Sequence, residues 1–327
     1  MATFYTLQQK SFHVNKEEGY AWCTLFFVEA AIVIALNMFA IIIFGTDRRV
    51  RKHSTYLLIN LSAADVGVGA LVIPASVLLR GNKYDLWNVK INPIGLISAY
   101  GVNLLFCGSS LGFLASISVE RLHATRNPIG HRSMSGLFYK IWGASIWVAS
   151  LIFTLFTIFF MYYDLLGTKI WFFAASGVFC LLLILCCSYC GIFATIRCGE
   201  QPRHEHRGQA RKERKLTITL FIVTLVSLCV WTPYVFFTFL EEQMTRILSD
   251  EALLRLRCIC ELLFFANSFV NPILYTIRIP EFRRAGIELI TCIKDSSSRQ
   301  QSQSTWRFQL DDCEKNELAL DKCIMQQ

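Results

Sequence analysis

Seven long apolar runs, separated by short polar stretches, form the main pattern along this chain. They cover about residues 21–44, 55–79, 94–120, 138–162, 170–196, 215–240 and 254–277. A helix needs ~20 mostly apolar residues to cross the ~30 Å hydrocarbon core of a bilayer. Each run meets this length, and none shows the alternation that is typical of a membrane barrel strand. The pattern therefore predicts an all-α membrane protein built as a bundle of seven transmembrane helices.

The composition favours a membrane protein over a soluble one. Hydrophobic residues make up 54% of the chain and charged residues only 17%. A soluble protein with seven core helices would carry polar stripes on them, and most of these runs do not. Many of the 13 cysteines lie inside the runs, where they are expected to act as small apolar residues. A bridge from Cys23 to Cys258 or to Cys260 stays open, because connectivity cannot be deduced from sequence.

Lys and Arg residues between the runs predict the orientation of the chain. The side that holds the first, third and fifth loops and the segment after the last run carries roughly twice as many of them as the other side. Because the positive side faces the cytoplasm, residues 1–20 are expected to form an extracellular tail ahead of the bundle at 21–278. This tail lacks a signal-peptide core, so the first run is expected to be the signal anchor. The net charge of +8 predicts contact with anionic membrane lipid and calls for no nucleic acid.

Several polar residues lie inside the runs, where polarity is costly and usually functional. The acidic ones are Glu29, Asp65, Glu120 and Glu261. One face of the third run carries Ser110, Leu114, Ile117 and Arg121, and one face of the seventh carries Asn267, Asn271 and Tyr275. The two stripes indicate either a wet internal seam or ordinary hydrogen bonding between helices.

Short motifs recur in order along the seven runs. They are Asn37, Leu61-Ser62-Ala63-Ala64-Asp65, Glu120-Arg121-Leu122, Trp147, Tyr189, Trp231-Thr232-Pro233 and Asn271-Pro272-x-x-Tyr275. Over about residues 20–295 this series resembles the rhodopsin-like (class A) G-protein-coupled receptors. The resemblance implies a plasma-membrane receptor that performs no covalent chemistry. It implies an extracellular ligand and a heterotrimeric G protein as partners.

The resemblance also implies a sodium site in the middle of the bundle. In the family, an Asp at the position of Asp65 holds a sodium ion, and Ser110, Asn267 and Asn271 match the rest of that site. Sodium takes hard oxygen ligands, which these side chains supply. No other cofactor is expected.

A switch at the cytoplasmic end is implied in the same way. Arg121 is expected to pair with Glu120 and with Glu213, a second acidic partner that would tie the sixth run to the third. A solvated Glu213 is the alternative. Pro233 would kink the sixth run, because proline removes a backbone donor. The remaining switch residues are Tyr189, Pro272 and Tyr275.

The chain departs from the family pattern at several positions. Leu96 stands where most relatives have a Cys bonded to the second outer loop, so that disulfide is absent. This loss and the short second outer loop resemble the melanocortin/lysolipid/cannabinoid/adenosine branch. Glu-Arg-Leu replaces Asp-Arg-Tyr at 120–122. A receptor with weak or no G-protein signalling, acting as a scavenger or dimer partner, therefore remains the alternative function.

The ligand is expected to bind in the outer half of the bundle. The candidate pocket residues are Asn103, Cys107, Trp231, Tyr234, Glu261 and Phe265. Asn103 stands where amine receptors have an Asp, which disfavours a monoamine, and Phe265 stands where opsins need a Lys, which disfavours retinal. Glu261 is the expected anchor for a cationic small molecule or peptide. Pairing of Glu261 with Arg255 or Arg257 is one alternative, and a protonated, silent side chain is the other.

The last residues predict attachments on the cytoplasmic side. Residues 279–294 are expected to form an amphipathic eighth helix at the membrane surface, and Cys292 is either palmitoylated or an unmodified thiol. Residues 295–327 predict a disordered tail. Its Ser and Thr residues are expected to be phosphorylated and to bind an arrestin-like protein, with a plain Ser-rich linker as the alternative.

Overall fold

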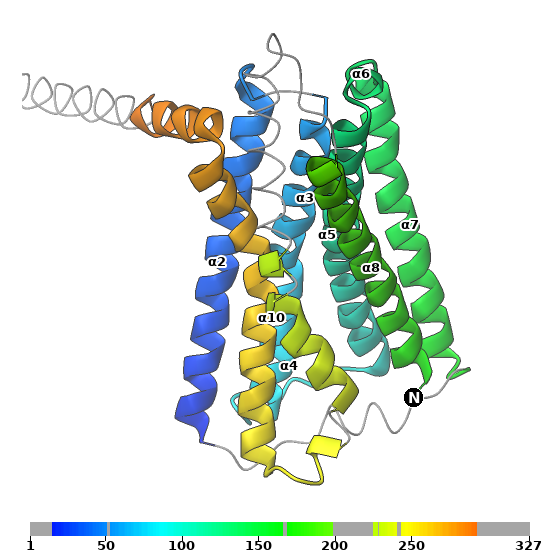
Figure 1. The fold of residues 1–327 in the computed structure, drawn as a ribbon. Coiled ribbons are helices and arrows are strands. Elements are labelled where there is room, and N and C mark those ends of the chain that lie inside the picture. Colours follow the sequence, from blue (N-terminus) through cyan, green and yellow to red (C-terminus); the bar gives the residue numbers. More distant parts are fainter. Residues whose placement is uncertain are drawn as a thin grey trace, which may run out of the picture.

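The computed structural model describes residues 15–50, 53–165, 169–198, 225–227, 229–240 and 243–292. Within these ranges the regular elements are all helices, and they stand side by side in one bundle (Figure 1). They are α2 (Lys16–Thr46), α3 (Thr55–Gly67), the π-helical η1 (Val68–Val72), α4 (Ile73–Lys83), α5 (Pro93–Arg126), α6 (Pro128–Arg132), α7 (Gly136–Tyr162), α8 (Lys169–Cys198) and α10 (Asp250–Arg278).

The helices reproduce the predicted runs closely. Among the described residues, five helices are long and apolar enough to cross a membrane: α2, the continuous 55–83 segment, α5, α7 and residues 173–195 of α8. The first part of the sixth run, 215–224, lies outside the described residues, and its remainder belongs to the helix Leu225–Leu240. The seventh run is α10, which spans 29 residues. The predicted all-α membrane fold is confirmed.

Side-chain caps mark where five helices begin among the described residues. Asn92 caps α5, whose first residue is Pro93, and its Oδ1 accepts from the backbone N–H of Gly95 at 2.6 Å. Four other helices start with the same kind of bond, made by Asn15 for α2, Asn127 for α6, Ser135 for α7 and Ser249 for α10. A cap satisfies one of the free N–H groups of the first helical turn. These ends are therefore fixed by polar chemistry that a count of apolar residues does not detect.

A π-helical turn interrupts the second span. Residues 68–72 form η1 between α3 and α4, and Pro74 follows at the start of α4. A π turn inserts an extra residue and changes which positions beyond it face the neighbouring helices. In α4 the buried positions include Val77, Arg80 and Gly81. The turn thus precedes a buried arginine at the end of the bundle that holds Glu261.

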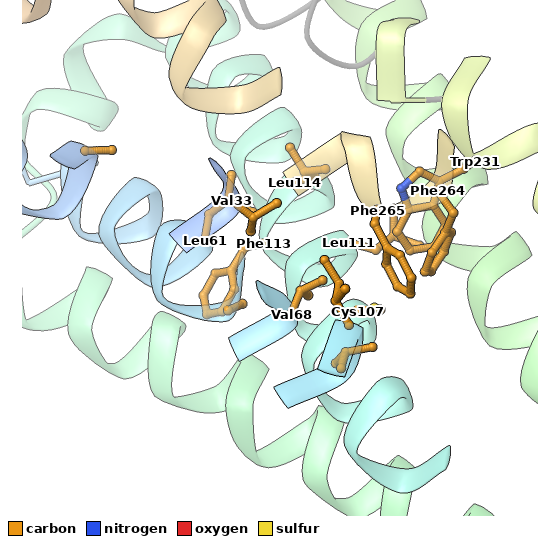
Figure 2. Close-up of a cluster of buried hydrophobic side chains, with 14 of the residues drawn as sticks. Val33, Leu61, Val68, Cys107, Leu111, Phe113, Leu114, Trp231, Phe264 and Phe265 are labelled. Carbon is orange, nitrogen blue, oxygen red and sulfur yellow. The ribbon is translucent and has the colours of Figure 1, made fainter. Parts of the chain in front are cut away.

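Trp147 joins α7 to α3 and α5. Its indole Nε1 donates to Oδ1 of Asn60 at 3.0 Å. Its ring makes edge contacts with Phe106 and Phe113, at centroid distances of 6.2 and 5.7 Å. Phe113 is fully buried beside Leu61 in the apolar cluster of Figure 2. This motif residue therefore combines apolar packing with a polar bond inside the bundle.

A second helical segment, residues 280–292, follows a break at Ile279. It turns away from α10 in Figure 1. The Arg49 guanidinium binds Asp47 and Glu288, with 3.0 Å between its Nη1 and Oε1 of Glu288, and these bonds lower the pKa of both carboxyls. Phe282 packs against Phe44 at 4.9 Å between ring centroids. The contacts hold the segment against the end of α2, while its place at a membrane surface stays a prediction.

The close approach of α3 and α5 predicts a sharp effect of one methyl group. A Cβ added to Gly67 would overlap the ring of Phe106, whereas a Cβ on Gly108 of α5 meets no atom within 4 Å. We expect Gly67→Ala to lower the free energy of unfolding by about 1–3 kcal/mol through overpacking. Gly108→Ala, the matched control, should be neutral or stabilising by up to ~1 kcal/mol, because Ala favours helix. Thermal unfolding of the purified protein in nanodiscs measures both, and equal stability of the two variants would contradict this packing.

Candidate functional site

Asp65 lies at the centre of the bundle and is completely buried. The hydroxyl of Ser110 donates to its Oδ1 at 2.8 Å, and Nδ2 of Asn271 donates to its Oδ2 at 3.2 Å. The three side chains come from α3, α5 and α10. The structure thus brings together three of the four residues that the sequence assigned to a sodium site.

Unpaired oxygen atoms accompany this cluster. Asn267, the fourth predicted residue, and Asn271 are both buried, and Oδ1 of each has no hydrogen-bond partner among the described residues. The side chain of Ser268 lies beside Asp65, and the Ser268 carbonyl accepts from Nδ2 of Asn37 at 2.8 Å. A buried carboxylate beside hydroxyl and amide oxygens is a donor set that suits a hard cation. Sequence reasoning missed Ser268, although its i, i+3 spacing from Asn271 places it on the same helix face.

Glu120 is the centre of a second buried polar cluster, at the opposite end of the bundle from Glu261. Its Oε1 accepts from Nη2 of Arg121 at 2.7 Å and lies 2.6 Å from Nε2 of His131. The hydroxyl of Tyr139 donates to the same oxygen at 3.4 Å and lies 3.1 Å from Nε2 of His131. The predicted Glu120–Arg121 pair is therefore present, and it is shared with two residues that the sequence did not indicate.

This cluster connects α5 to the loop that follows it. His131 belongs to α6, a five-residue helix in which no residue is buried. The bonds of His131 to Glu120 and Tyr139 thus connect this short helix to α5 and α7. Glu213, the other predicted partner of Arg121, lies outside the described residues.

Aromatic rings line the predicted ligand region. Phe264 of α10 lies between Trp231 and Tyr234, at centroid distances of 4.7 and 4.5 Å, and its ring is 5.3 Å from that of Phe265. Figure 2 shows Trp231, Phe264 and Phe265 grouped on one side and Cys107 nearby on α5. Asn103, four residues earlier on α5, is half-buried. Sequence reasoning missed Phe264, which is central to the group.

Glu261 is already paired within the protein. It forms an ion pair with Arg80 of α4 and a second one with Arg257, one turn away on α10, at 3.2 Å from Nε to Oε1. Arg255 instead pairs with Glu18 at 2.8 Å. Pairing with Arg257, one of the two alternatives that the sequence left open, is present, and Arg80 is an addition. The role of Glu261 in binding a cationic ligand stays a prediction, and such a ligand would have to compete with two arginines.

The remaining predicted residues occupy scattered positions. Tyr189, Pro272 and Tyr275 are buried, Pro233 is half-buried, and Cys292 is exposed at the end of the 280–292 segment. The structure holds Cys23, Cys258 and Cys260 as free thiols, so neither bridge that the sequence left open is formed.

Comparison with known proteins identifies the family and several distant relatives. The model of the family described as "7 transmembrane receptor (rhodopsin family)" matches residues 36–275. The histamine H2 receptor of Homo sapiens is 25% identical over 291 residues, which cover 80% of this chain and 77% of the relative. Opsin-VA of Rutilus rutilus is 23% identical over 82% of this chain and 73% of its own length. The neuropeptides B/W receptor type 1 of Rattus norvegicus is 24% identical over 81% of this chain and 85% of its own length.

The position of α6 depends on His131, which predicts an effect on local opening. We expect His131→Ala to accelerate backbone hydrogen exchange in residues 128–134 by about 10-fold, because a hydrogen bond to a charged group contributes roughly 1.5–3 kcal/mol. His123→Ala is the control for losing the ring contact alone, since its ring lies 6.2 Å from that of His131 and its Nε2 has no hydrogen-bond partner among the described residues. Mass-spectrometric hydrogen exchange checks the prediction, and unchanged rates in His131→Ala would show that α6 is held by other contacts.

Proposed function

Because the chain belongs to the rhodopsin family of 7 transmembrane receptors, we propose that it converts binding of an extracellular ligand into nucleotide exchange on a heterotrimeric G protein. The observation that carries the proposal is the order of three buried clusters in one bundle. The aromatic group around Phe264 comes first, the Asp65 cluster lies between, and the Glu120–Arg121 pair comes last. A receptor needs such a connected series between its two faces.

Helix α10 is the element that links the first two clusters. It carries Phe264 and Phe265 in the aromatic group, and Asn271, which binds Asp65. A ligand that displaces α10 would therefore disturb the bonds of Asp65, which connect α10 to α3 and α5. The ligand would shift the equilibrium between two receptor states only by the difference between its affinities for the two states. The proposed relay runs along α5 to Arg121.

We place the Arg121 end in the cytoplasm and the amino terminus outside. The distribution of Lys and Arg residues supports this orientation. By the family pattern, Glu120 and Glu213 would first release Arg121. The G protein would then contact the freed Arg121 side chain. The Ser and Thr residues of 295–327 would bind an arrestin-like protein, and Cys292 would take a lipid; both assignments rest on the sequence alone.

A sodium ion is proposed at Asp65. Asp65, Ser110, Asn267 and Asn271 would hold it, and the unpartnered Oδ1 atoms of the two asparagines support this fit. A bound cation would offset the buried negative charge. The side chains themselves connect three helices, so the site would favour the state in which those helices are closest.

The names of the relatives do not converge on a ligand. They specify a histamine receptor, an opsin and a neuropeptide receptor. Asn103 and Phe265 replace the residues that, by the family pattern, a monoamine and retinal require. The ligand class must therefore be inferred from this chain's own residues.

Release of Arg121 should raise signalling without any ligand. We expect Glu120→Gln to increase ligand-free nucleotide exchange by roughly 5- to 10-fold, since it weakens a buried charged hydrogen bond. Adding Arg121→Ala should abolish the increase. Glu18→Gln, which breaks an ion pair at the opposite end of the bundle, is the control and should have no effect.

The assay uses the purified full chain in nanodiscs with each major class of G protein. If Glu120→Gln activates none of them while remaining folded, the G-protein proposal is wrong. A scavenging or dimer-partner receptor would then be favoured.

The sodium proposal predicts a salt-specific stability. Replacing choline chloride by sodium chloride at constant ionic strength should stabilise the protein by about 1.4 kcal/mol when sodium is near ten times its Kd. Asp65→Asn should remove this difference, whatever its own effect on stability. Asp85→Asn, at an acid exposed on the surface, should retain it. Thermal unfolding in the two salts is the measurement, and an equal sodium effect in Asp65→Asn would contradict the site.

A further inference from the structure

A cavity of about 420 Å³ lies between the end of α2 and the 280–292 segment. These two elements lie beside each other at one end of the bundle (Figure 1). The apolar part of the cavity lining is Ile43, Ala285 and Leu289, and the charged part is Asp47, Arg48 and Glu288. Ile43 and Ala285 are buried, whereas Arg48 and Glu288 are exposed. The cavity therefore has an apolar floor and a charged rim, and its volume is in the range of small-molecule sites.

Glu288 keeps acceptor capacity at this rim. The Arg49 guanidinium donates one hydrogen bond to each of its oxygens, through Nη1 to Oε1 and through Nη2 to Oε2. A carboxylate has about four acceptor positions, and the side chain of Glu288 is 62% exposed. Asp47 accepts from Nε and Nη2 of the same arginine and so fixes its orientation. Glu288 is thus held in a defined place while two of its acceptor positions stay open.

Arg48 supplies the opposite charge on the same rim. It is exposed, and it forms no hydrogen bond or ion pair with another residue in the described part of the chain. Arginine is well suited to bind phosphate, because its planar fork of donors matches the phosphate oxygens. A headgroup that carries both a phosphate and an ammonium would therefore find a partner for each, in Arg48 and in Glu288.

The lining favours a primary ammonium over a quaternary one. Quaternary ammonium groups are recognised by the faces of aromatic rings, and none of the residues that line this cavity is aromatic. A primary ammonium carries three N–H donors, which suit the open positions of Glu288. A headgroup with negative charge alone would leave those positions unused and place its charge beside a carboxylate.

We propose that this cavity binds the headgroup of a phosphatidylethanolamine lipid. The ammonium donates to Glu288, the phosphate accepts from Arg48, and the glycerol end of the lipid covers the apolar floor. Both elements that form the cavity belong to a membrane environment, since α2 is long and apolar enough to span a bilayer. The 280–292 segment also exposes Ile287 and Ile290, with 59% and 58% of their surface accessible. These features favour a lipid over a water-soluble ligand.

The inference differs from the general attraction of a basic chain to anionic lipid. The net charge of +8 acts on any negatively charged headgroup near the membrane surface. The cavity selects differently, because its rim places a carboxylate beside an arginine. The bound lipid would connect α2 to the 280–292 segment at a position next to the Arg49–Glu288 ion pair.

A series of headgroups with the same phosphate and the same dioleoyl chains tests the proposal. The four lipids are phosphatidylethanolamine, its N-methyl form, its N,N-dimethyl form and phosphatidylcholine. Native mass spectrometry of the purified full chain, with each lipid titrated separately, measures the Kd of the first bound lipid. Affinity should fall along the series, and phosphatidylcholine should bind about 3-fold or more weakly than phosphatidylethanolamine, because it has lost every N–H donor to Glu288.

Variants on the surface assign the preference to the cavity. Glu288→Gln should make the affinities for phosphatidylethanolamine and phosphatidylcholine nearly equal, since only the ammonium contacts Glu288. Arg48→Gln should weaken both lipids by about 3-fold and keep the preference, because both carry the same phosphate. Leu289→Trp should weaken both by filling the apolar floor without a change of charge. Glu281→Gln and Arg283→Gln, at exposed positions of the same segment outside the cavity lining, are the matched controls and should keep both the affinities and the preference.

The measurements need no G protein, so their outcome is independent of the nucleotide-exchange assay. Equal affinity for the four lipids, or a preference that survives Glu288→Gln, would overturn the inference. A site for anionic lipid would instead bind phosphatidylglycerol more tightly than phosphatidylethanolamine in the unaltered chain. A second copy of the chain on this face would appear as a dimer that Leu289→Trp dissociates, with no headgroup preference. Either of these results would also overturn the inference.

Discussion

The pairing of buried charge inside an apolar bundle is the constraint on which the rest of this structure depends. A carboxylate within a membrane helix cannot rely on water, so it needs donors or cations from neighbouring helices. Asp65, Glu120 and Glu261 meet this need in three different ways. Asp65 has neutral donors, Glu120 has one arginine with a histidine and a tyrosine, and Glu261 has two arginines. Each set of bonds connects different helices, and each leaves a different net charge on the cluster.

The sequence contained most of the fold because bilayer thickness sets the length of every span. The fourth run was predicted at 138–162, and α7 covers Gly136–Tyr162. What hydropathy could not predict is local chemistry at the ends and inside the spans. The cap at Ser249 adds a turn outside the apolar region, since α10 begins at Asp250, four residues before the predicted run, and the π turn at Val68–Val72 is hidden in a run that looks uniformly apolar. The short helix α6 has no buried face and therefore no periodic signal at all.

The candidate site divides along similar lines. Ser110 and Asn271 were found because helical spacing and family motifs both point to them, and their bonds to Asp65 follow. Partners from distant segments gave no such signal. Arg80 lies 181 positions from Glu261, and in the sequence it looked like an ordinary cation of an outer loop. His131 likewise lies between the third and fourth runs, where no motif pointed to it. Sequence spacing predicts which residues share a helix face, but not which helices place their faces together.

The three clusters differ in how easily their bonds can be exchanged, and this difference bears on how a signal could pass. A carboxylate held by a single donor gives a fixed link, whereas one shared by several donors can lose one and keep the others. Glu120 is shared between α5, α6 and Tyr139 of α7, and Glu261 between α4 and α10. A change at either end then costs less than the full price of a buried unpaired charge. Between these two clusters, the Asp65 carboxylate accepts hydrogen bonds from Ser110 of α5 and from Asn271 of α10. A shift of α10 therefore changes the environment of α5 without breaking any helix. Shared acceptors thus allow a rigid bundle to occupy two states that differ by only a few hydrogen bonds.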